Sequence, residues 1–147
     1  MSEKLDNCAF CNITSEPERV IRVGRYVTSF LSNPRLVKGH ALIVPNRHIT
    51  SVLDLCYEEM EEMGFETERI GELLLASLAD GIDTWTKYRP LVPENQIKAN
   101  HMHLHILPSR KDDAIYSTGV IWNAENFTEL TPEERDETIK LLRIVES

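Results

Sequence analysis

This chain of 147 residues lacks long hydrophobic runs and has few cysteines. No apolar stretch approaches the roughly 18 residues that cross a bilayer, and the N-terminal residues lack the apolar core of a signal peptide. The three cysteines, Cys8, Cys11 and Cys56, are too few for a disulfide framework. We therefore expect a cytoplasmic protein in a reducing compartment, with no membrane association.

Positive charge is also in short supply. Lysine and arginine number 16 against 24 aspartates and glutamates, which gives a formal net charge of -8. Binding to nucleic acid or to a membrane surface requires a cationic face, so neither kind of partner is expected. The 41% of hydrophobic and 27% of charged residues are typical of a globular chain and not of a disordered one.

Linkers and internal repeats are absent too, so residues 1–147 are interpreted as one domain, with a core over about residues 8–122 and a helical tail over about 131–145. Short β-branched or aromatic segments bounded by proline or glycine predict strands at 27–31 and 39–44, with a turn around Asn33-Pro34 between them. Two further strands are predicted at 83–89 and 101–107.

A helical pattern begins near Val52, where apolar or small residues recur every three to four positions and glutamates lie between them: Cys56, Met60, Met63, Thr67, Ile70, Leu74 and Leu78. The pattern predicts a long amphipathic helix with a solvated acidic face. A capping box with proline at the first helical position, Thr131-Pro132-Glu133-Glu134, predicts a last helix. The element order favours an α+β fold, an antiparallel sheet with the long helix on one face and a C-terminal helix.

All five histidines lie in two short segments, 40–48 and 101–105. Three histidines at i, i+2 and i+4 would occur in about one of 360 shuffled sequences of this composition. In a strand these three side chains share one face, while Met102, Leu104 and Ile106 take the other. The histidine face is expected to open onto a cleft, although solvated histidines on an edge strand are the alternative.

One metal ion cannot bind all three of these histidines, because i to i+4 along a strand spans about 13 Å and metal–nitrogen bonds are about 2 Å. At most two of them could share an ion. The spaced row suits another chemistry. A neutral imidazole can attack phosphorus while its neighbours bind the charged oxygens.

The segment 101–107 resembles the histidine triad signature, in which three histidines alternate with hydrophobic residues. The segment 39–45, together with His48, resembles the upstream strand of that family, and Cys8-Ala9-Phe10-Cys11 resembles the cysteine pair that opens many microbial members. The resemblance extends from about Cys8 to Trp122. It implies a nucleotide-binding hydrolase or transferase that acts at an α-phosphate, has an α+β fold and is a homodimer.

By position, the resemblance makes His103 the nucleophile that forms a covalent nucleotidyl-imidazole. It makes His105 the residue that contacts the phosphate and helps the leaving group depart, and His40 a support from the neighbouring strand. The roles fit imidazole chemistry, because a side chain with a pKa of about 6.5 is largely neutral at pH 7.

The cysteine pair indicates a metal site. Cys8 and Cys11 supply two soft ligands, and a structural zinc needs four. The resemblance implies that the other two ligands are His48 and His101, the positions that match the zinc-binding histidines of zinc-bearing relatives. Zinc is therefore expected as a structural ion, with no cofactor in the chemical step. A free thiol pair or a redox motif is the alternative, although no thioredoxin-like βαβ pattern surrounds it. Cys56 is expected in the core.

The chain departs from the family pattern in the substrate-binding segments. Most relatives have Gly-Gln and then Ser or Thr before the triad, where this chain has Lys98 and Asn100 as replacements for the hydroxyl or as solvated strand residues. The group that holds the ribose aligns near Ser32, with Asn33 beside it, though Asn before Pro is also ordinary turn chemistry. Trp122, in a segment that resembles the tail of some bacterial relatives, either lines the base pocket or packs.

The sequence therefore predicts an enzyme that cleaves a nucleoside polyphosphate or nucleoside phosphoramidate at the α-phosphate. A nucleotide-binding regulatory protein with weak catalysis is the alternative, supported by the altered segment before the triad. A family member that deadenylates DNA ends is disfavoured by the net charge of -8 and by the lack of a second zinc-finger extension.

Overall fold

Within residues 4–93, 99–113 and 126–143, which the computed structural model describes, the chain forms a five-stranded antiparallel sheet. In spatial order the strands are β1 (Val20–Val23), β2 (Val27–Leu31), β3 (Ala41–Pro45), β5 (Leu104–Ser109) and β4 (Gly81–Trp85). A long helix and a C-terminal helix accompany the sheet, so the expected α+β fold is confirmed.

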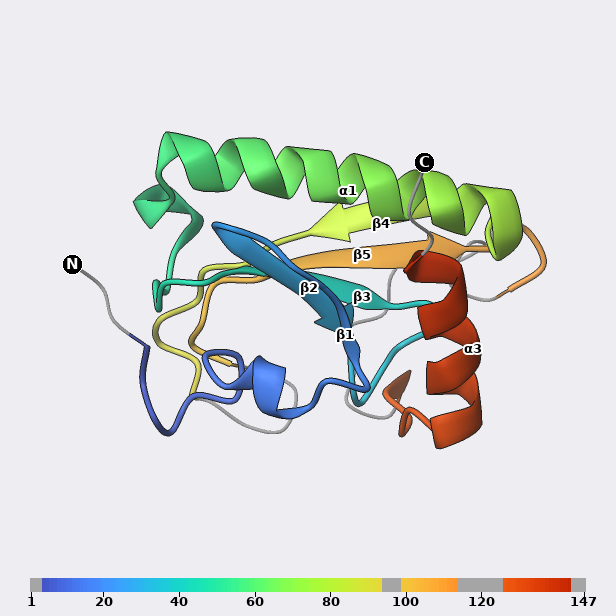
Figure 1. The fold of residues 1–147 in the computed structure, drawn as a ribbon, viewed down its shortest axis with the longest axis horizontal. Helices are drawn as coiled ribbons and strands as arrows, with labels where there is room; N and C mark the ends of the chain where they lie inside the picture. Colours follow the sequence, from blue (N-terminus) through green and yellow to red (C-terminus); the bar gives the residue numbers. More distant parts are fainter. Residues whose placement is uncertain (1–3, 94–98, 114–125, 144–147) are drawn as a thin grey trace.

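The helices are α1 (Tyr57–Ser77) and α3 (Pro132–Leu142), with short 3-10 turns η1 (Ile13–Ser15) and η2 (Val52–Asp54). Figure 1 shows α1 along one side of the sheet, the N-terminal segment with η1 on the other side, and α3 at the end near β1. Thr131 caps α3 by accepting from the backbone N–H of Glu134 at 3.2 Å, and Pro132 begins the helix. The capping pattern in the sequence thus gives the helix start correctly.

Each face of the sheet is buried by alternate residues of the same strands, because neighbouring side chains on a strand point to opposite sides. One face, with Val27, Leu31, Ala41 and Ile43, packs against Ile70 and Leu74 of α1 and shares its core with Ile139 and Leu142 of α3. The other face, with Val20, Phe30, Leu42 and Val44, is covered in part by the N-terminal segment through Ile13 and Phe10. This second face carries the candidate site.

Two strand boundaries differ from the prediction. The strand expected at 101–107 begins only at Leu104. His101 Nε2 donates to the Pro45 carbonyl at 2.8 Å and Met102 N donates to Ile49 O at 2.7 Å, so other bonds replace the ladder there. The strand expected at 83–89 is β4, which ends at Trp85 opposite His105, near the start of its partner β5. No strand was predicted at β1.

The long helix begins later than Val52, and Cys56 precedes it. Cys56 is half-buried and its backbone N–H donates to Glu59 Oε1 at 2.9 Å, so its placement in the core was wrong. Met60, expected on the buried stripe, is 51% exposed. The buried stripe includes Glu59 and Glu66 where the pattern predicted Met60 and Thr67, because these glutamates have hydrogen-bond partners, and it agrees with the pattern at Met63, Ile70 and Leu74.

Two glutamates of α1 that were expected in solvent, Glu59 and Glu66, are buried. Arg47 binds the Glu59 carboxylate with two nitrogens, at 2.8 and 2.9 Å. Glu66 accepts from Ser29 of β2 and from Arg69. The partner of each buried carboxylate stabilises its charge, as buried charges require.

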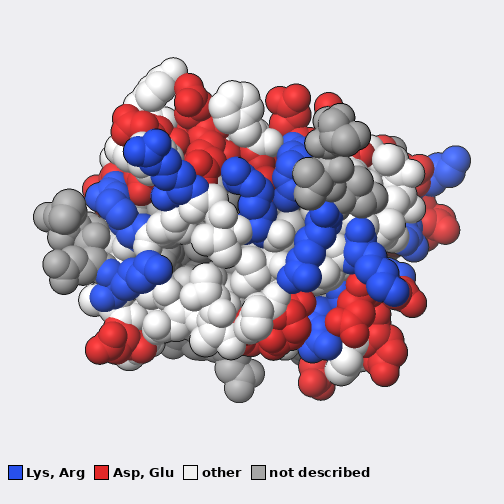
Figure 2. Space-filling view, viewed as in Figure 1, with Lys and Arg blue, Asp and Glu red and all other residues white. Residues whose placement is uncertain are grey.

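The surface carries charges of both signs. Figure 2 shows acidic side chains along the edge of the molecule where α1 lies, with lysines and arginines among them. In the described part of the chain, no helix combines the length and the apolar character needed to span a bilayer.

Candidate active site and metal centre

Two cysteines and two histidines from three separate segments meet in one cluster. Cys8 and Cys11 lie in the N-terminal segment, His48 follows β3, and His101 precedes β5. Their ligand atoms all lie within 4.8 Å of one another. The structure thus brings together the four residues that the sequence singled out for zinc.

The cluster has the dimensions of a tetrahedral zinc site. Cys11 Sγ lies 3.3 Å from His48 Nδ1 and 3.5 Å from His101 Nδ1, and Cys8 Sγ lies 3.4 Å from His101 Nδ1. Zinc bonds of about 2.3 Å to sulfur and about 2.0 Å to nitrogen, at tetrahedral angles, would separate sulfur from nitrogen by about 3.5 Å. Four protein ligands form a closed site, so the cluster is placed to hold a structural zinc ion.

Hydrogen bonds around the cluster orient the ligand atoms of Cys8, Cys11 and His101. The backbone N–H of Leu5 donates to Cys11 Sγ at 3.3 Å and that of Cys11 donates to Cys8 Sγ at 3.4 Å. His101 Nε2 donates to the Pro45 carbonyl at 2.8 Å, which leaves the lone pair on Nδ1, toward the sulfurs. A carbonyl partner on the far nitrogen is the usual arrangement for a metal-binding histidine. Burial lowers the pKa of His101 to about 4, which keeps it neutral.

The other two triad histidines line a cavity that Cys8 and His48 of the metal cluster also border. His103 Nδ1 lies 2.7 Å from the carbonyl oxygen of His101, so that nitrogen carries the proton and Nε2 carries the lone pair. The His103 and His105 rings are 4.7 Å apart and meet edge to face. The row of three histidines therefore divides between two sites, one for metal and one beside the cavity.

His40 supports His105 from the neighbouring strand. His40 Nδ1 accepts from the backbone N–H of Leu36 at 3.1 Å, so its proton lies on Nε2. That Nε2 lies 2.9 Å from His105 Nδ1 and donates to it, which places the proton of a neutral His105 on Nε2. Gly39, at φ 91°, turns the chain into His40, and a Cβ there would lie 3.0 Å from Pro108 Cγ.

His103 and His105 at the cavity, and His40 behind them, are neutral around pH 7. Burial, followed by the charges of His103 and Arg35, lowers the pKa of His40 to about 3. Burial is also the main cause that lowers the pKa of His103 and of His105 below 6.5. A neutral His103 keeps its Nε2 lone pair available for attack.

A cavity of about 560 Å³ lies on the sheet face opposite α1. Four of the residues expected to contact substrate line it: His105, Ser32, Asn33 and Asn100. His103 lines it as well, while His40 lies behind His105 and is 1% exposed. Lys98 and Trp122, the remaining expected contacts, lie outside the described residues.

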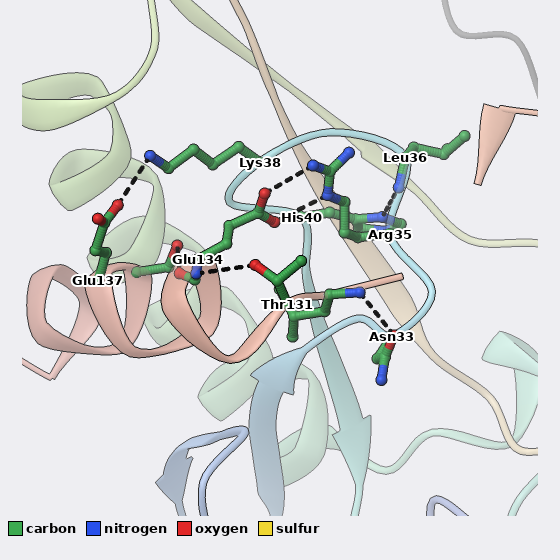
Figure 3. Close-up of polar contacts among 10 residues, drawn as sticks. Asn33, Arg35, Leu36, Lys38, His40, Thr131, Glu134 and Glu137 are labelled. Atoms are coloured by element: carbon green, nitrogen blue, oxygen red, sulfur yellow. Dashed lines mark hydrogen bonds and ion pairs between the residues drawn. The ribbon is translucent and has the colours of Figure 1, made fainter. Parts of the chain in front are cut away.

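Residues 32–34 form part of the cavity wall, and the loop 32–38 that contains them is held by α3 and by the residues just before it (Figure 3). Asn33 Oδ1 accepts from the Leu130 backbone N–H at 3.0 Å. The Arg35 guanidinium binds both carboxylate oxygens of Glu134, at 2.8 and 2.7 Å. Lys38 pairs with Glu137 at 3.2 Å. Asn33 therefore anchors the loop with its carbonyl, and its amide nitrogen does not take part in that bond.

Phe10, Glu16 and Arg19 are among the cavity residues that the sequence patterns missed. Phe10 lies inside the cysteine motif, and its ring is 5.2 Å from that of His103. Arg19 is 7% exposed and lies over the Phe30 ring at 5.5 Å. Burial lowers the pKa of Arg19, against the opposing charges of Glu16 and Glu18. Glu16 and Arg19 belong to no motif, so no sequence signal marked them.

Comparisons with known proteins agree with this geometry. The family model described as the HIT domain matches residues 14–112. Protein hit from Bacillus subtilis is 25% identical over 121 residues, which cover 80% of this chain and 79% of the relative. An uncharacterized HIT-like protein from Mycobacterium tuberculosis is 29% identical over 117 residues, covering 74% of this chain and 75% of that protein.

A solved structure of a zinc-bound histidine triad family protein from Mycobacterium smegmatis superposes with a TM-score of 0.69 at 25% identity, covering 93% of this chain and 91% of that one. The family model spans more than half of the chain and includes the triad and the upstream histidine, His40. The Cys/His cluster is formed in the same fold. The chain therefore belongs to the HIT, or histidine triad, family, whose members include nucleotide hydrolases and transferases.

Proposed function

We propose that the protein is a nucleotidyl hydrolase or transferase that cleaves a nucleoside polyphosphate or a nucleoside phosphoramidate at the α-phosphate. The observation that carries the proposal is the hydrogen bond that fixes the tautomer of His103. Its Nδ1–H donates to the His101 carbonyl at 2.7 Å, which leaves a lone pair on Nε2 of a ring that lines the cavity. A nitrogen nucleophile with this arrangement is suited to attack phosphorus.

In the first step, the Nε2 lone pair forms a bond to the α-phosphorus while the bond from phosphorus to the leaving oxygen or nitrogen breaks. His103 keeps its Nδ1–H, and the His101 carbonyl that accepts it stabilises the positive charge that develops on the ring. In the second step, a water oxygen attacks the phosphorus and the phosphorus–nitrogen bond returns to Nε2 as a lone pair. The proton of the water leaves to solvent.

His105 serves the same reaction as a hydrogen-bond donor. His40 donates to Nδ1 of His105, so the proton of a neutral His105 lies on Nε2, the nitrogen that would donate to a phosphoryl oxygen. Burial lowers the pKa of His105, so this residue is neutral and is a weak source of protons for the leaving group. A phosphate chain departs as an anion and needs none, whereas an amine takes its proton from water or arrives protonated.

The zinc cluster supports the site from outside the reaction. The M. smegmatis relative is zinc-bound, and the four ligands here fit the same ion. Zinc bound to Cys8, Cys11, His48 and His101 would fix His101, whose carbonyl orients His103. The ion supplies rigidity to these residues and does not take part in the bond changes.

The proposal is tested by trapping the intermediate. Dinucleoside polyphosphates and nucleoside phosphoramidates are mixed with the protein, and the reaction is stopped without acid, because a phosphorus–nitrogen bond is acid-labile. Intact mass should show one nucleotide added per chain. His103→Ala should remove the adduct and lower turnover by about 10³-fold or more, with mononucleotide affinity kept within about tenfold.

Thr84→Ala is a control, because Thr84 is exposed and lies outside the cavity lining. It should keep both adduct and turnover. Comparable turnover in His103→Ala and the parent would overturn the role of His103. Nucleotide binding by the parent with neither adduct nor turnover would instead favour the regulatory alternative.

A further inference from the structure

A second cavity, of about 130 Å³, adjoins the first one and is lined by two cationic side chains. Thr50, Ala99 and Asn100 line both cavities. Lys87 and Arg89, from the segment that follows β4, line the second cavity and not the first. None of the described residues in the lining of the second cavity is acidic. A space bordered in this way is suited to bind an anion.

The strand pairing places Lys87 on the sheet face that carries the histidines of the first cavity. Trp85 is the partner of His105 in the antiparallel pair of β4 and β5. Thr86 Oγ1 donates to the His103 carbonyl at 2.9 Å, so the chain still runs beside its partner after β4 ends. Residues two apart in an extended chain point to the same side, and Lys87 Nζ lies 5.4 Å from the centre of the Trp85 ring. The ammonium group therefore lies on the histidine face.

The electrostatics agree with this placement. Burial is the main cause that lowers the pKa of His103 and of His105, and the charge of Lys87 lowers both further. The pKa of Lys87 is itself lowered by burial and then by the charge of Arg89. Lys87 is thus a half-buried cation with a second cation close by. A bound anion would offset both the lost hydration and the repulsion.

The two adjoining cavities correspond to the two parts of a nucleoside polyphosphate. The larger one, of about 560 Å³, has the size of a small-molecule site, and the smaller one has room for a small group only. With the α-phosphate at His103 Nε2, a nucleoside in the larger cavity leaves the smaller one, beside Lys87, for the other substituent of the phosphorus. That substituent is the leaving group of the proposed reaction.

The charge of the leaving group decides how well it fits there. When the bond from phosphorus to the bridging oxygen breaks, its electron pair stays on the phosphate chain, which gains negative charge. An amine leaves neutral or protonated, so it offers Lys87 no negative charge. We propose that the second cavity binds the phosphate chain of the leaving group through Lys87, and that the site takes nucleoside polyphosphates in preference to nucleoside phosphoramidates. The inference rests on the proposed function, because it requires an α-phosphate at His103.

A binding experiment tests the second cavity without turnover. AMP carries the α-phosphate alone, whereas α,β-methylene-ADP adds a β-phosphate through a carbon bridge that cannot be hydrolysed. In calorimetric titrations, the full chain should bind the methylene analogue on the order of tenfold tighter than AMP. Lys87→Met keeps an apolar stem without the charge. It should lower the affinity for the analogue by about that factor and keep the AMP affinity within about threefold.

A kinetic experiment tests the preference between the substrate classes. The value of kcat/KM is measured for a diadenosine polyphosphate and for adenosine phosphoramidate, which share the nucleoside and differ in the leaving group. The parent should prefer the polyphosphate. Lys87→Met should lower kcat/KM for the polyphosphate on the order of tenfold and keep that for the phosphoramidate within about threefold. Measurement at pH 8 keeps His103 neutral in both proteins, so that its protonation does not differ between them.

Two further variants separate anion binding from packing. Lys87→Arg keeps a cation and should keep most of both differences. Lys111→Met is the control, because Lys111 is exposed and outside the lining of both cavities, and it should keep the differences in full. Equal losses for both nucleotides and both substrates in Lys87→Met would show a role in packing alone and overturn the inference.

The inference is also overturned by equal affinities of the parent for AMP and the methylene analogue, by a higher kcat/KM for the phosphoramidate, or by differences that Lys87→Met leaves unchanged. In each case the adduct and turnover of the proposed function stand. If neither nucleotide binds and no adduct forms, the proposed function fails, and the inference fails with it.

Discussion

His101 makes three separate contacts, and each of its polar groups has a different partner. Its Nδ1 faces the two sulfurs, its Nε2 donates to the Pro45 carbonyl, and its own carbonyl accepts from His103. A residue that binds metal thus also sets which nitrogen of the nucleophile is protonated. Replacement of His101 would alter both sites at once.

His40 predicts a pH dependence of stability. The buried imidazole stays neutral down to a pKa of about 3, with His105, His103 and Arg35 around it, whereas in the unfolded chain it binds a proton below about 6.5. Because the folded pKa is lowered, stability from this group is present above pH 6.5 and is lost as the pH falls toward 3. The loss approaches about 1.4 kcal/mol per pH unit.

Denaturant unfolding of the parent and of His40→Asn between pH 7 and pH 4.5 measures this contribution. The Asn side chain can still accept from Leu36 N–H but does not titrate in this range. The slope of the unfolding free energy against pH should be smaller in the variant by about one bound proton. Equal slopes would show that His40 does not change protonation on unfolding.

The sequence patterns predicted the site unevenly at this scale. The triad and the cysteine pair were found because each is local, with spacings of two to four residues, and the family resemblance added His48 and His101 to the metal ligands. Arg19 was missed because Phe30 and Arg143, which fix its side chain and its backbone, are distant in the sequence. Glu66 was placed in solvent because its partner Ser29 comes from β2. Long-range pairing of this kind leaves no periodic signal.

Among the elements, α3 and the residues at its two ends contact the segments that line the cavity without lining it themselves. Its N-terminal end holds the loop 32–38 through Asn33 and Arg35, and the residue after its C-terminal end holds the backbone beside Arg19. It also buries Ile139 and Leu142 against the core shared with α1. The helix therefore packs against the core on the α1 side of the sheet and also contacts two segments that line the cavity on the other side.

Glu134→Gln tests this connection. The Arg35–Glu134 pair is half-buried and bidentate, so the loss of its charge should destabilise the fold by about 1 to 2 kcal/mol and weaken mononucleotide binding several-fold through movement of the loop 32–38. Thermal unfolding and calorimetric titration measure the two effects.

Glu137→Gln is the matched control, because the Lys38–Glu137 pair is exposed and such pairs contribute little. It should change neither quantity measurably. Unchanged nucleotide affinity in Glu134→Gln, with the expected loss of stability, would limit α3 to a structural role.

The zinc cluster acts at the scale of the whole molecule, because its ligands come from three segments that are far apart in the sequence. We expect about one zinc per chain. Its removal by a chelator should lower Tm by several degrees or more and free the N-terminal segment, with its Phe10, from the cavity. Elemental analysis measures the zinc content, and thermal unfolding measures the change in Tm.

Cys8→Ser should lose the zinc, and Cys56→Ser should keep it, since Cys56 lies outside the cluster. Protein prepared without chelators that contains no zinc and has two freely reactive thiols at Cys8 and Cys11 would contradict the assignment. That result would favour the free thiol pair or the redox motif.

The position of α3 in the chain has a consequence for biosynthesis. The five strands and the four metal ligands all precede Arg110, whereas the contacts that hold the cavity walls come from residues 128–143. The strands and the metal ligands are therefore synthesised before the residues that hold the cavity walls. A chain truncated near Asn126 would keep all four metal ligands and lose the contacts that hold the walls of the nucleotide cavity.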